Sequence, residues 1–157
     1  MNIKLNIKKS YFNEVYLPYL NNTERFTVFY GGAGSGKSVF VCQKLILKLL
    51  KYPKRTLLVI RKVSASLRDS IYQEFITHLT KFGLIDYCKV MGSSLTIYLP
   101  NESKIIFKGI DDPEKLKSIS GIDDIMIEEA TEITLDDFTQ LNLRLRSKAE
   151  NQQITLC

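Results

Sequence analysis

The sequence contains little cysteine, little histidine and no long apolar run. Its 157 residues include three cysteines, Cys42, Cys88 and Cys157, with no C-x-x-C pair, and a single histidine, His78. Zinc sites and disulfide frameworks are therefore not expected, and the thiols are expected to be reduced. No apolar run reaches the roughly 18 residues that a membrane span needs, and the N-terminus lacks the apolar block of a signal peptide. These absences predict a cytoplasmic chain that does not associate with a membrane.

The chain is also too short for two full domains. Its composition, 45% hydrophobic and 25% charged, is typical of one soluble globular domain. The net charge of +5 is unevenly distributed, with +10 in residues 1–62, +1 in residues 63–108 and −6 in residues 109–157. The basic part is suited to anions and the acidic part to cations. Charge alone leaves nucleic-acid binding and an ordinary basic protein about equally open.

Apolar runs of strand length alternate with helical patterns along the first half of the chain. The expected elements are a buried strand at 25–30, a helix at 37–51, a strand at 56–60 and a helix at 66–82. In the first helix, Lys44, Lys48 and Lys51 have the spacing of a solvated face. The second helix begins with Ser66 and Asp69 at the spacing of a capping box. Two successive strand–helix units favour a parallel sheet with helices on its faces.

The second half of the chain predicts a hairpin and a further strand–helix unit. Residues 95–99 and 104–110 predict an antiparallel hairpin, residues 125–127 a strand, residues 135–146 a helix and residues 153–157 a strand. Because the last strand has no closing turn, we expect an incomplete domain, and an edge strand at the C-terminus is the alternative. The expected fold class is α/β, with a mostly parallel sheet, an antiparallel hairpin and three α/β/α layers.

Residues 31–38 match the motif G-x-x-x-x-G-K-S/T between a predicted strand and a predicted helix. A loop that wraps phosphates turns its backbone N–H groups inward, and its glycines permit the positive φ angles and the close approach. We expect Lys37 to reach the β- and γ-phosphates of ATP and Ser38 to ligate Mg²⁺. The expected nucleotide-binding residues are Gly31, Gly32, Ala33, Gly34, Ser35, Gly36, Lys37, Ser38 and Val39.

Two adjacent glutamates, Glu128 and Glu129, follow the apolar run 125–127. Hydrolysis needs an acid that holds Mg²⁺ and a base that orients the attacking water. We assign Glu128 to the metal, and Glu129 to water activation as a catalytic residue alongside Lys37. The alternative is that both are surface acids of an acidic segment. Because whole strands lie between the loop and these acids, we expect a P-loop NTPase of the type with an additional strand and a catalytic glutamate.

Several segments together resemble the N-terminal ATPase domain of phage terminase large subunits, the DNA-packaging motors. They are residues 30–38 with GGAGSGKS, residues 60–75 with RKVSASLRDS, residues 109–134 with IEEATEI, and residues 141–146. The resemblance implies hydrolysis of ATP with Mg²⁺ that drives double-stranded DNA into a procapsid. It also implies a homo-oligomeric ring, with the small terminase subunit and the portal protein as partners.

Two features depart from this family. Related packaging ATPases often carry an arginine finger within the phosphate loop, where this chain has Gly32, Ala33 and Gly34. The finger must then come from elsewhere in the chain or from a neighbouring subunit. The candidates are Arg68, Lys117, Arg144 and Arg146. The second departure is the lack of the C-terminal nuclease domain, so we expect a single ATPase domain over residues 1–157 and no nuclease activity.

Three further interpretations stay open. Arg61 and Lys62 end a predicted strand at the edge where ligands of parallel sheets bind, so they are candidates for contact with phosphate or DNA, and a solvated helix cap is about as well supported. The aromatic residues of segment 12–16 either stack on adenine or pack on the sheet, and we favour packing. A nucleotide-binding or assembly module that is inactive in isolation is the main functional alternative. A kinase is disfavoured because it needs an arginine-rich lid, and Arg144 and Arg146 are the only close pair of arginines in the sequence.

Overall fold

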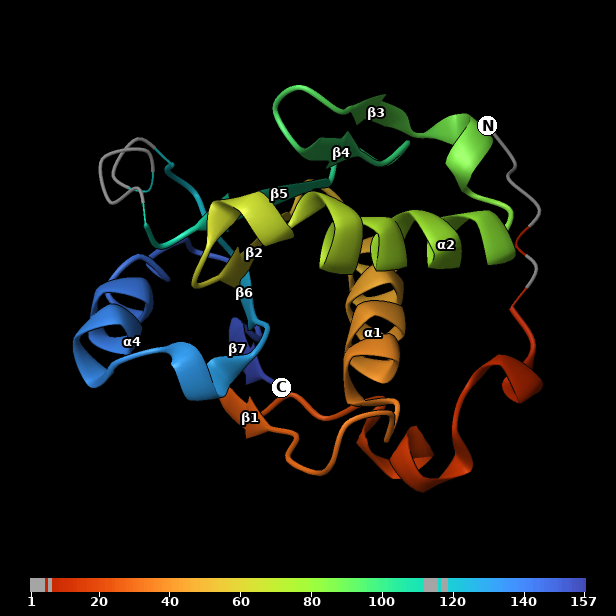
Figure 1. Ribbon diagram of the computed structural model, residues 1–157. Helices are drawn as coiled ribbons and strands as arrows, with labels where there is room; N and C mark the ends of the chain where they lie inside the picture. The colour runs from red at the N-terminus through yellow and green to blue at the C-terminus, as the bar shows by residue number, and fades with distance from the viewer. Residues whose placement is uncertain (1–4, 6, 112–115, 117–118) are drawn as a thin grey trace.

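The computed structural model describes residue 5, residues 7–111, residue 116 and residues 119–157. These residues form one seven-stranded sheet with helices on both faces (Figure 1). The expected α/β class with three layers is confirmed. The grey segments of Figure 1 are the residues outside this description.

The regular elements agree with most of the expected ones. The helices are α1 (Lys37–Lys51), α2 (Gln73–Lys81) and α4 (Leu135–Asn142), and the strands are β1 (Phe26–Val28), β2 (Thr56–Arg61), β3 (Lys89–Met91), β4 (Thr96–Tyr98), β5 (Lys104–Gly109), β6 (Asp124–Ile127) and β7 (Gln153–Leu156). Short 3-10 helices cover Lys9–Tyr11, Glu14–Tyr19, Ser64–Ser66, Ile85–Tyr87 and Ala130–Glu132. The hairpin is β4 with β5, whereas β3 was not predicted.

The order of the strands brings the carboxyl ends of β1, β7, β6 and β2 together. The order is β1-β7-β6-β2-β5-β4-β3. The first five strands in this order, β1, β7, β6, β2 and β5, run parallel, whereas β4 pairs antiparallel with both β5 and β3. Strand β7 lies between β1 and β6, so the additional strand expected between the phosphate loop and the glutamates is confirmed. The last strand is an inner strand of the sheet, and the edge-strand alternative is wrong.

Alternate residues of β2 pack into two different cores, one on each face of the sheet. Leu57 and Val59 face the core that includes side chains of α1 and α2. Leu58 and Ile60 face a second core that includes Leu141 of α4. This alternation is the two-residue period of a strand. Figure 1 shows α1 and α2 separated from α4 by the sheet.

Strand β1 is less buried than the sequence predicted. It lies at one edge of the sheet in the described part of the chain, and Phe26 and Val28 are 47% and 62% exposed. The prediction of a buried strand is therefore wrong. The apolar run correctly predicted a strand, but strand propensity does not predict which strand lies at the edge of the sheet.

The solvated lysine face predicted for α1 is also wrong at two of its three positions. Lys44 is buried, and Lys48 Nζ donates to Asp124 Oδ1 at 2.6 Å. Arg55 Nη1 donates to the other oxygen of Asp124 at 3.0 Å. Lys51 is exposed as predicted. A carboxylate supplied by β6 thus turns part of α1 into a buried charged contact, which the spacing of lysines alone does not reveal.

The segment before α2 departs from a regular helix. Ser66 Oγ donates to the carbonyl of Val63 at 3.0 Å, and the predicted capping box is absent. Instead, the π-helix Arg68–Tyr72 leads into α2, with Ser70 in a non-helical conformation. A capping box occurs at α4, between Thr134 and Asp137. It fits the S/T-x-x-D/E pattern and could have been found from the sequence.

Two exclusions made from the sequence concern cysteine chemistry and membranes. All three cysteines are free. Across the described ranges, no helix is long and apolar enough to cross a membrane.

Candidate nucleotide-binding site

The phosphate loop, residues 31–38, connects the end of β1 to the start of α1. Gly34 and Gly36 have φ angles of 74° and 81°, in the left-handed region that favours glycine. Gly36 is the N-cap of α1, and its carbonyl accepts a hydrogen bond from the N–H of Phe40 at 3.0 Å. The loop therefore turns sharply into the helix and leaves the free N–H groups of its first turn beside the loop, where an anion binds favourably.

Lys37 is folded back over this loop. Its Nζ donates to the carbonyls of Gly31 at 2.8 Å and Gly32 at 3.0 Å, and to Ser35 Oγ at 3.2 Å. These three acceptors hold a positive charge at the mouth of the loop. An ammonium in this position adds to the positive helix terminus and favours a phosphate ligand.

A cavity of about 680 Å³ joins the loop to the two glutamates. Its lining includes the expected loop residues other than Gly32, together with Glu128, Glu129, Ala130, Thr131, Leu156 and Cys157. The size lies within the range of small-molecule and cofactor sites. The structure thus brings together residues almost 100 positions apart that the sequence assigned to one site.

Glu128 directly follows β6 and lines this cavity, and its carboxylate is only partly paired. Its Oε2 lies 3.6 Å from Arg61 Nε and has no hydrogen-bond partner among the described residues. Burial raises the pKa of Glu128, and the nearby Arg61 opposes that rise. Ser38 lines the same cavity and donates to Cys157 Sγ at 3.9 Å. Ser38 and Glu128 both line this cavity, and a hydroxyl and a carboxylate are the kinds of oxygen ligand that Mg²⁺ takes from proteins when phosphates complete its coordination.

Glu129 forms an ion pair with Arg61, a contact that was not predicted from the sequence. Glu129 has a positive φ of 53°, and its Oε2 accepts from Arg61 Nε at 3.0 Å, while Arg61 Nη2 pairs with the other oxygen. Arg61 Nη1 also donates to Ser70 Oγ at 2.8 Å and to the carbonyl of Ser66 at 3.3 Å. Arg61 therefore joins the glutamates to the irregular segment before α2. The carboxyl ends of neighbouring strands β2 and β6 were the signal that could have predicted this meeting.

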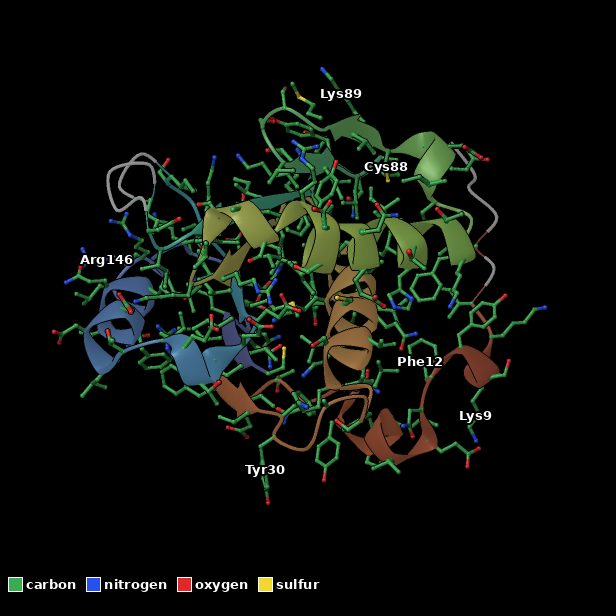
Figure 2. All side chains as sticks on the ribbon, in the orientation of Figure 1. Lys9, Phe12, Tyr30, Cys88, Lys89 and Arg146 are labelled. Carbon is green, nitrogen blue, oxygen red and sulfur yellow. The ribbon has the colours of Figure 1, made fainter. Side chains whose placement is uncertain are left out.

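The other candidate cations lie elsewhere. Lys62 Nζ pairs with Asp137 at 2.8 Å, Arg68 Nη2 donates to the carbonyl of Gly92 at 2.6 Å, and Arg144 Nη1 donates to that of Leu116 at 2.9 Å. Arg146 is exposed in the segment between α4 and β7. Figure 2 shows it at the left of the view, away from the cavity-lining residue Tyr30 at the bottom. Lys117 lies outside the described residues. No arginine appears among the described residues that line the cavity.

The aromatic residues of segment 12–16 pack within the protein. Phe12 is buried and stacks on Phe82, and Tyr16 stacks on Phe40 with its hydroxyl donating to the carbonyl of Ser35 at 3.1 Å. The favoured packing interpretation is confirmed. Tyr16 also supports the phosphate loop from behind through this hydrogen bond.

The strand order, the loop at the start of α1 and the acids at the end of β6 define a P-loop NTPase fold with an additional strand. Residues 23–157 match the family model for the phage terminase large subunit. The chain belongs to the phage terminase large-subunit family.

Relatives and solved structures agree with this family. The chain is 41% identical over 135 residues to the PBSX phage terminase large subunit of Bacillus subtilis, which covers 85% of this chain and 31% of that protein. It is 32% identical over 115 residues to the terminase large subunit of Bacillus phage SPP1, covering 70% of this chain and 27% of that protein. The chain thus spans between a quarter and a third of these relatives' length.

The fold is similar to solved terminase structures. A large terminase from a thermophilic bacteriophage in complex with ADP has a TM-score of 0.72 at 10% identity and covers 88% of this chain and 34% of its own. The N-terminal domain of the DNA-packaging ATPase from bacteriophage phi29 has a TM-score of 0.64 at 15% identity and covers 94% and 79%. At these identities the likeness concerns the fold.

Proposed function

We propose that this chain is the ATP-binding and ATP-hydrolysing part of a motor that moves double-stranded viral DNA into a procapsid in the host cytoplasm. The observation that carries the proposal is the cavity in which the phosphate loop faces Glu128 and Glu129. Family membership supports the DNA-packaging context. In that context we expect a homo-oligomeric ring with the small terminase subunit and the portal protein as partners.

In this proposal the loop residues 31–39 bind the phosphates of ATP through their N–H groups, and Lys37 moves from the loop carbonyls to the β- and γ-phosphates. Ser38 and Glu128 would hold Mg²⁺, which supplies charge neutralisation on the phosphates. Once Glu129 is released from Arg61, its carboxylate accepts a proton from the attacking water. The four side chains given a role, Lys37, Ser38, Glu128 and Glu129, all line the cavity.

The test is Glu129→Gln, with Glu132→Gln as the matched control. Glu132 is an exposed acid three residues further along the chain and is not part of the cavity lining. We expect Glu129→Gln to retain binding of a fluorescent ATP analogue and to lower hydrolysis by about 10²–10⁴-fold, as for loss of a general base. Glu132→Gln should change neither. Equal turnover of wild type and Glu129→Gln in an active assembly contradicts the assignment of Glu129.

A second function, a nucleotide-binding module that does not hydrolyse ATP as an isolated chain, is favoured by one observation. Arg61 engages Glu129, and no arginine lines the described part of the cavity. An arginine supplied by a neighbouring subunit would then be required for fast hydrolysis. ATPase activity measured against protein concentration, with and without DNA, separates the two. A specific activity that rises with protein concentration favours a motor assembled from several chains. A lack of ATPase activity at all concentrations favours the module.

A further inference from the structure

A row of basic and aromatic side chains crosses the outer strands of the sheet. Strand register places Lys89 of β3 opposite Tyr98 of β4, and Tyr98 opposite Lys104 of β5. Directly opposed residues of paired strands project to the same face. Lys108, four residues beyond Lys104 on β5, projects to that face as well. We refer to these four residues as the lysine face.

The lysine face lies on the side of the sheet opposite α1 and α2. Ile106, between the two lysines of β5, packs against the core that contains Leu141 of α4. Its neighbours Ile105 and Phe107 point into the core formed with α1 and α2. Strand β5 is therefore apolar toward one helical layer and carries lysines toward the other side. Lys89 extends outward from β3 at the top of the molecule in Figure 2.

The side chains of the lysine face are accessible, and its lysines are unpaired. Lys89 is exposed, Tyr98 is 39% exposed, and Lys104 and Lys108 are half-buried. In the described ranges, none of the three lysines has an ion pair or a side-chain hydrogen bond. The acid in the β4–β5 turn, Glu102, pairs with Lys54 at 3.7 Å. The face therefore carries three cations without a described counter-charge.

Protection of a sheet edge does not explain this arrangement. Lysines on edge strands prevent edge-to-edge pairing, which is sufficient reason for Lys89 on β3. Strand β5, however, is an inner strand between β2 and β4, and its backbone is already paired on both sides. Lys104 and Lys108 therefore need another explanation.

We propose that the lysine face binds the phosphate backbone of duplex DNA, a proposal that rests on the DNA-moving function proposed above. Two strand spacings separate Lys89 from Lys104 by roughly 10 Å, and four residues separate Lys104 from Lys108 by roughly 13 Å. Flexible lysine side chains at these spacings reach several separate phosphates. The Tyr98 hydroxyl adds a donor that also serves phosphate contacts. Lysine is depleted from protein–protein interfaces, so a nucleic-acid backbone is the better fit.

The experiment compares two triple variants of the 157-residue chain. One changes Lys89, Lys104 and Lys108 to Ala, and the control changes Lys9, Lys51 and Lys81 to Ala, three exposed lysines in the N-terminal segment, α1 and α2. Both remove the same charge. Binding to a fluorescent duplex of about 30 base pairs is followed by anisotropy, without nucleotide, over a salt series. We expect the first variant to weaken binding about tenfold and to reduce the slope of log K against log salt by about 2–3, while the control loses less than threefold.

Four outcomes overturn the proposal. Two concern the duplex itself: the wild-type chain does not bind it at low salt, or both triple variants lose the same amount of affinity for it. Two concern other ligands: polyglutamate competes as well as unlabelled duplex, or a single strand binds more tightly than the duplex and this binding depends on Tyr98. If thermal melting shows that the alanine variant is unfolded, the same three positions are changed to Gln and the measurement is repeated. Because no nucleotide is present, failure here leaves the hydrolysis proposal intact, and failure of Glu129→Gln leaves this one intact.

Discussion

The burial of the Glu128 carboxylate destabilises the folded chain. Its carboxylate is largely buried, and one oxygen lacks a hydrogen-bond partner among the described residues. Burial raises the pKa of Glu128, so the folded chain holds this proton more tightly than the unfolded chain does. The stability contributed by this group is therefore greatest at low pH and falls as pH rises above the ordinary value of 4.5. Such a residue is more easily explained by ligand binding than by folding.

We therefore expect Glu128→Gln to stabilise the chain in the absence of nucleotide and metal. The gain should be on the order of 1 kcal/mol near neutral pH, or roughly 2–4 °C in melting temperature. It should shrink as the pH is lowered toward 4.5, because the raised pKa leaves more of the wild-type carboxyl protonated in the folded state than in the unfolded state. Thermal melts at the two pH values measure the difference. A gain that is the same at both, or a loss at neutral pH, contradicts the interpretation. Glu132→Gln, at an exposed position, should be neutral.

At the scale of elements, one buried carboxylate joins α1 to the strands beneath it. Asp124, at the start of β6, accepts from Lys48 of α1 and from Arg55 just before β2. Lys48 Nζ also donates to Gln153 Oε1 at 2.8 Å, at the start of β7. Burial raises the pKa of Asp124 despite these two cations. The network fixes the end of α1 far from the phosphate loop against three strands, which orients the helix whose other end forms the site.

Removing the carboxylate of Asp124 should destabilise the chain strongly. Asp124→Asn leaves Lys48 and Arg55 buried without a counter-charge, and loss of one partner of a buried pair costs about 3–5 kcal/mol. The melting temperature should fall by roughly 6 °C or more. The control is Glu102→Gln, because Glu102 forms an exposed pair with Lys54 that should contribute less than about 1 kcal/mol. If the two substitutions have equal and small effects on the free energy of unfolding in urea, the Asp124 network does not hold α1 in place.

For the whole molecule, local patterns predicted the elements well and their long-range contacts poorly. The helical period and Pro53 define α1 at both ends, and alternating β-rich runs define the hairpin of β4 and β5. The phosphate loop motif and the acids after β6 also led to one cavity. The positions of those residues follow from short sequence signals and from the parallel order of the strands.

Contacts between distant segments were missed for a physical reason. Lys48 meets Asp124 across 76 residues, and Arg61 meets Glu129 across 68 residues. A lysine at helical spacing looks the same in sequence whether water or a carboxylate faces it. Likewise, the apolar pattern of β1 does not reveal that this strand lies at an edge. The elements could therefore be predicted from neighbouring residues, but the pairing of charges needed the strand order.

Nucleotide binding should stabilise the molecule as a whole, because only the folded chain assembles the phosphate loop beside Glu128 and Glu129. At an ADP concentration 100-fold above its Kd, linkage adds about 2.7 kcal/mol, and the melting temperature should rise by roughly 5–11 °C. Lys37→Ala should lose most of this rise because its ammonium lies at the mouth of the loop. Lys51→Ala, which removes an exposed lysine at the other end of α1, should keep it. Calorimetry at several ADP concentrations measures the shift. An equal rise in both variants would mean that ADP binds the chain outside the phosphate loop.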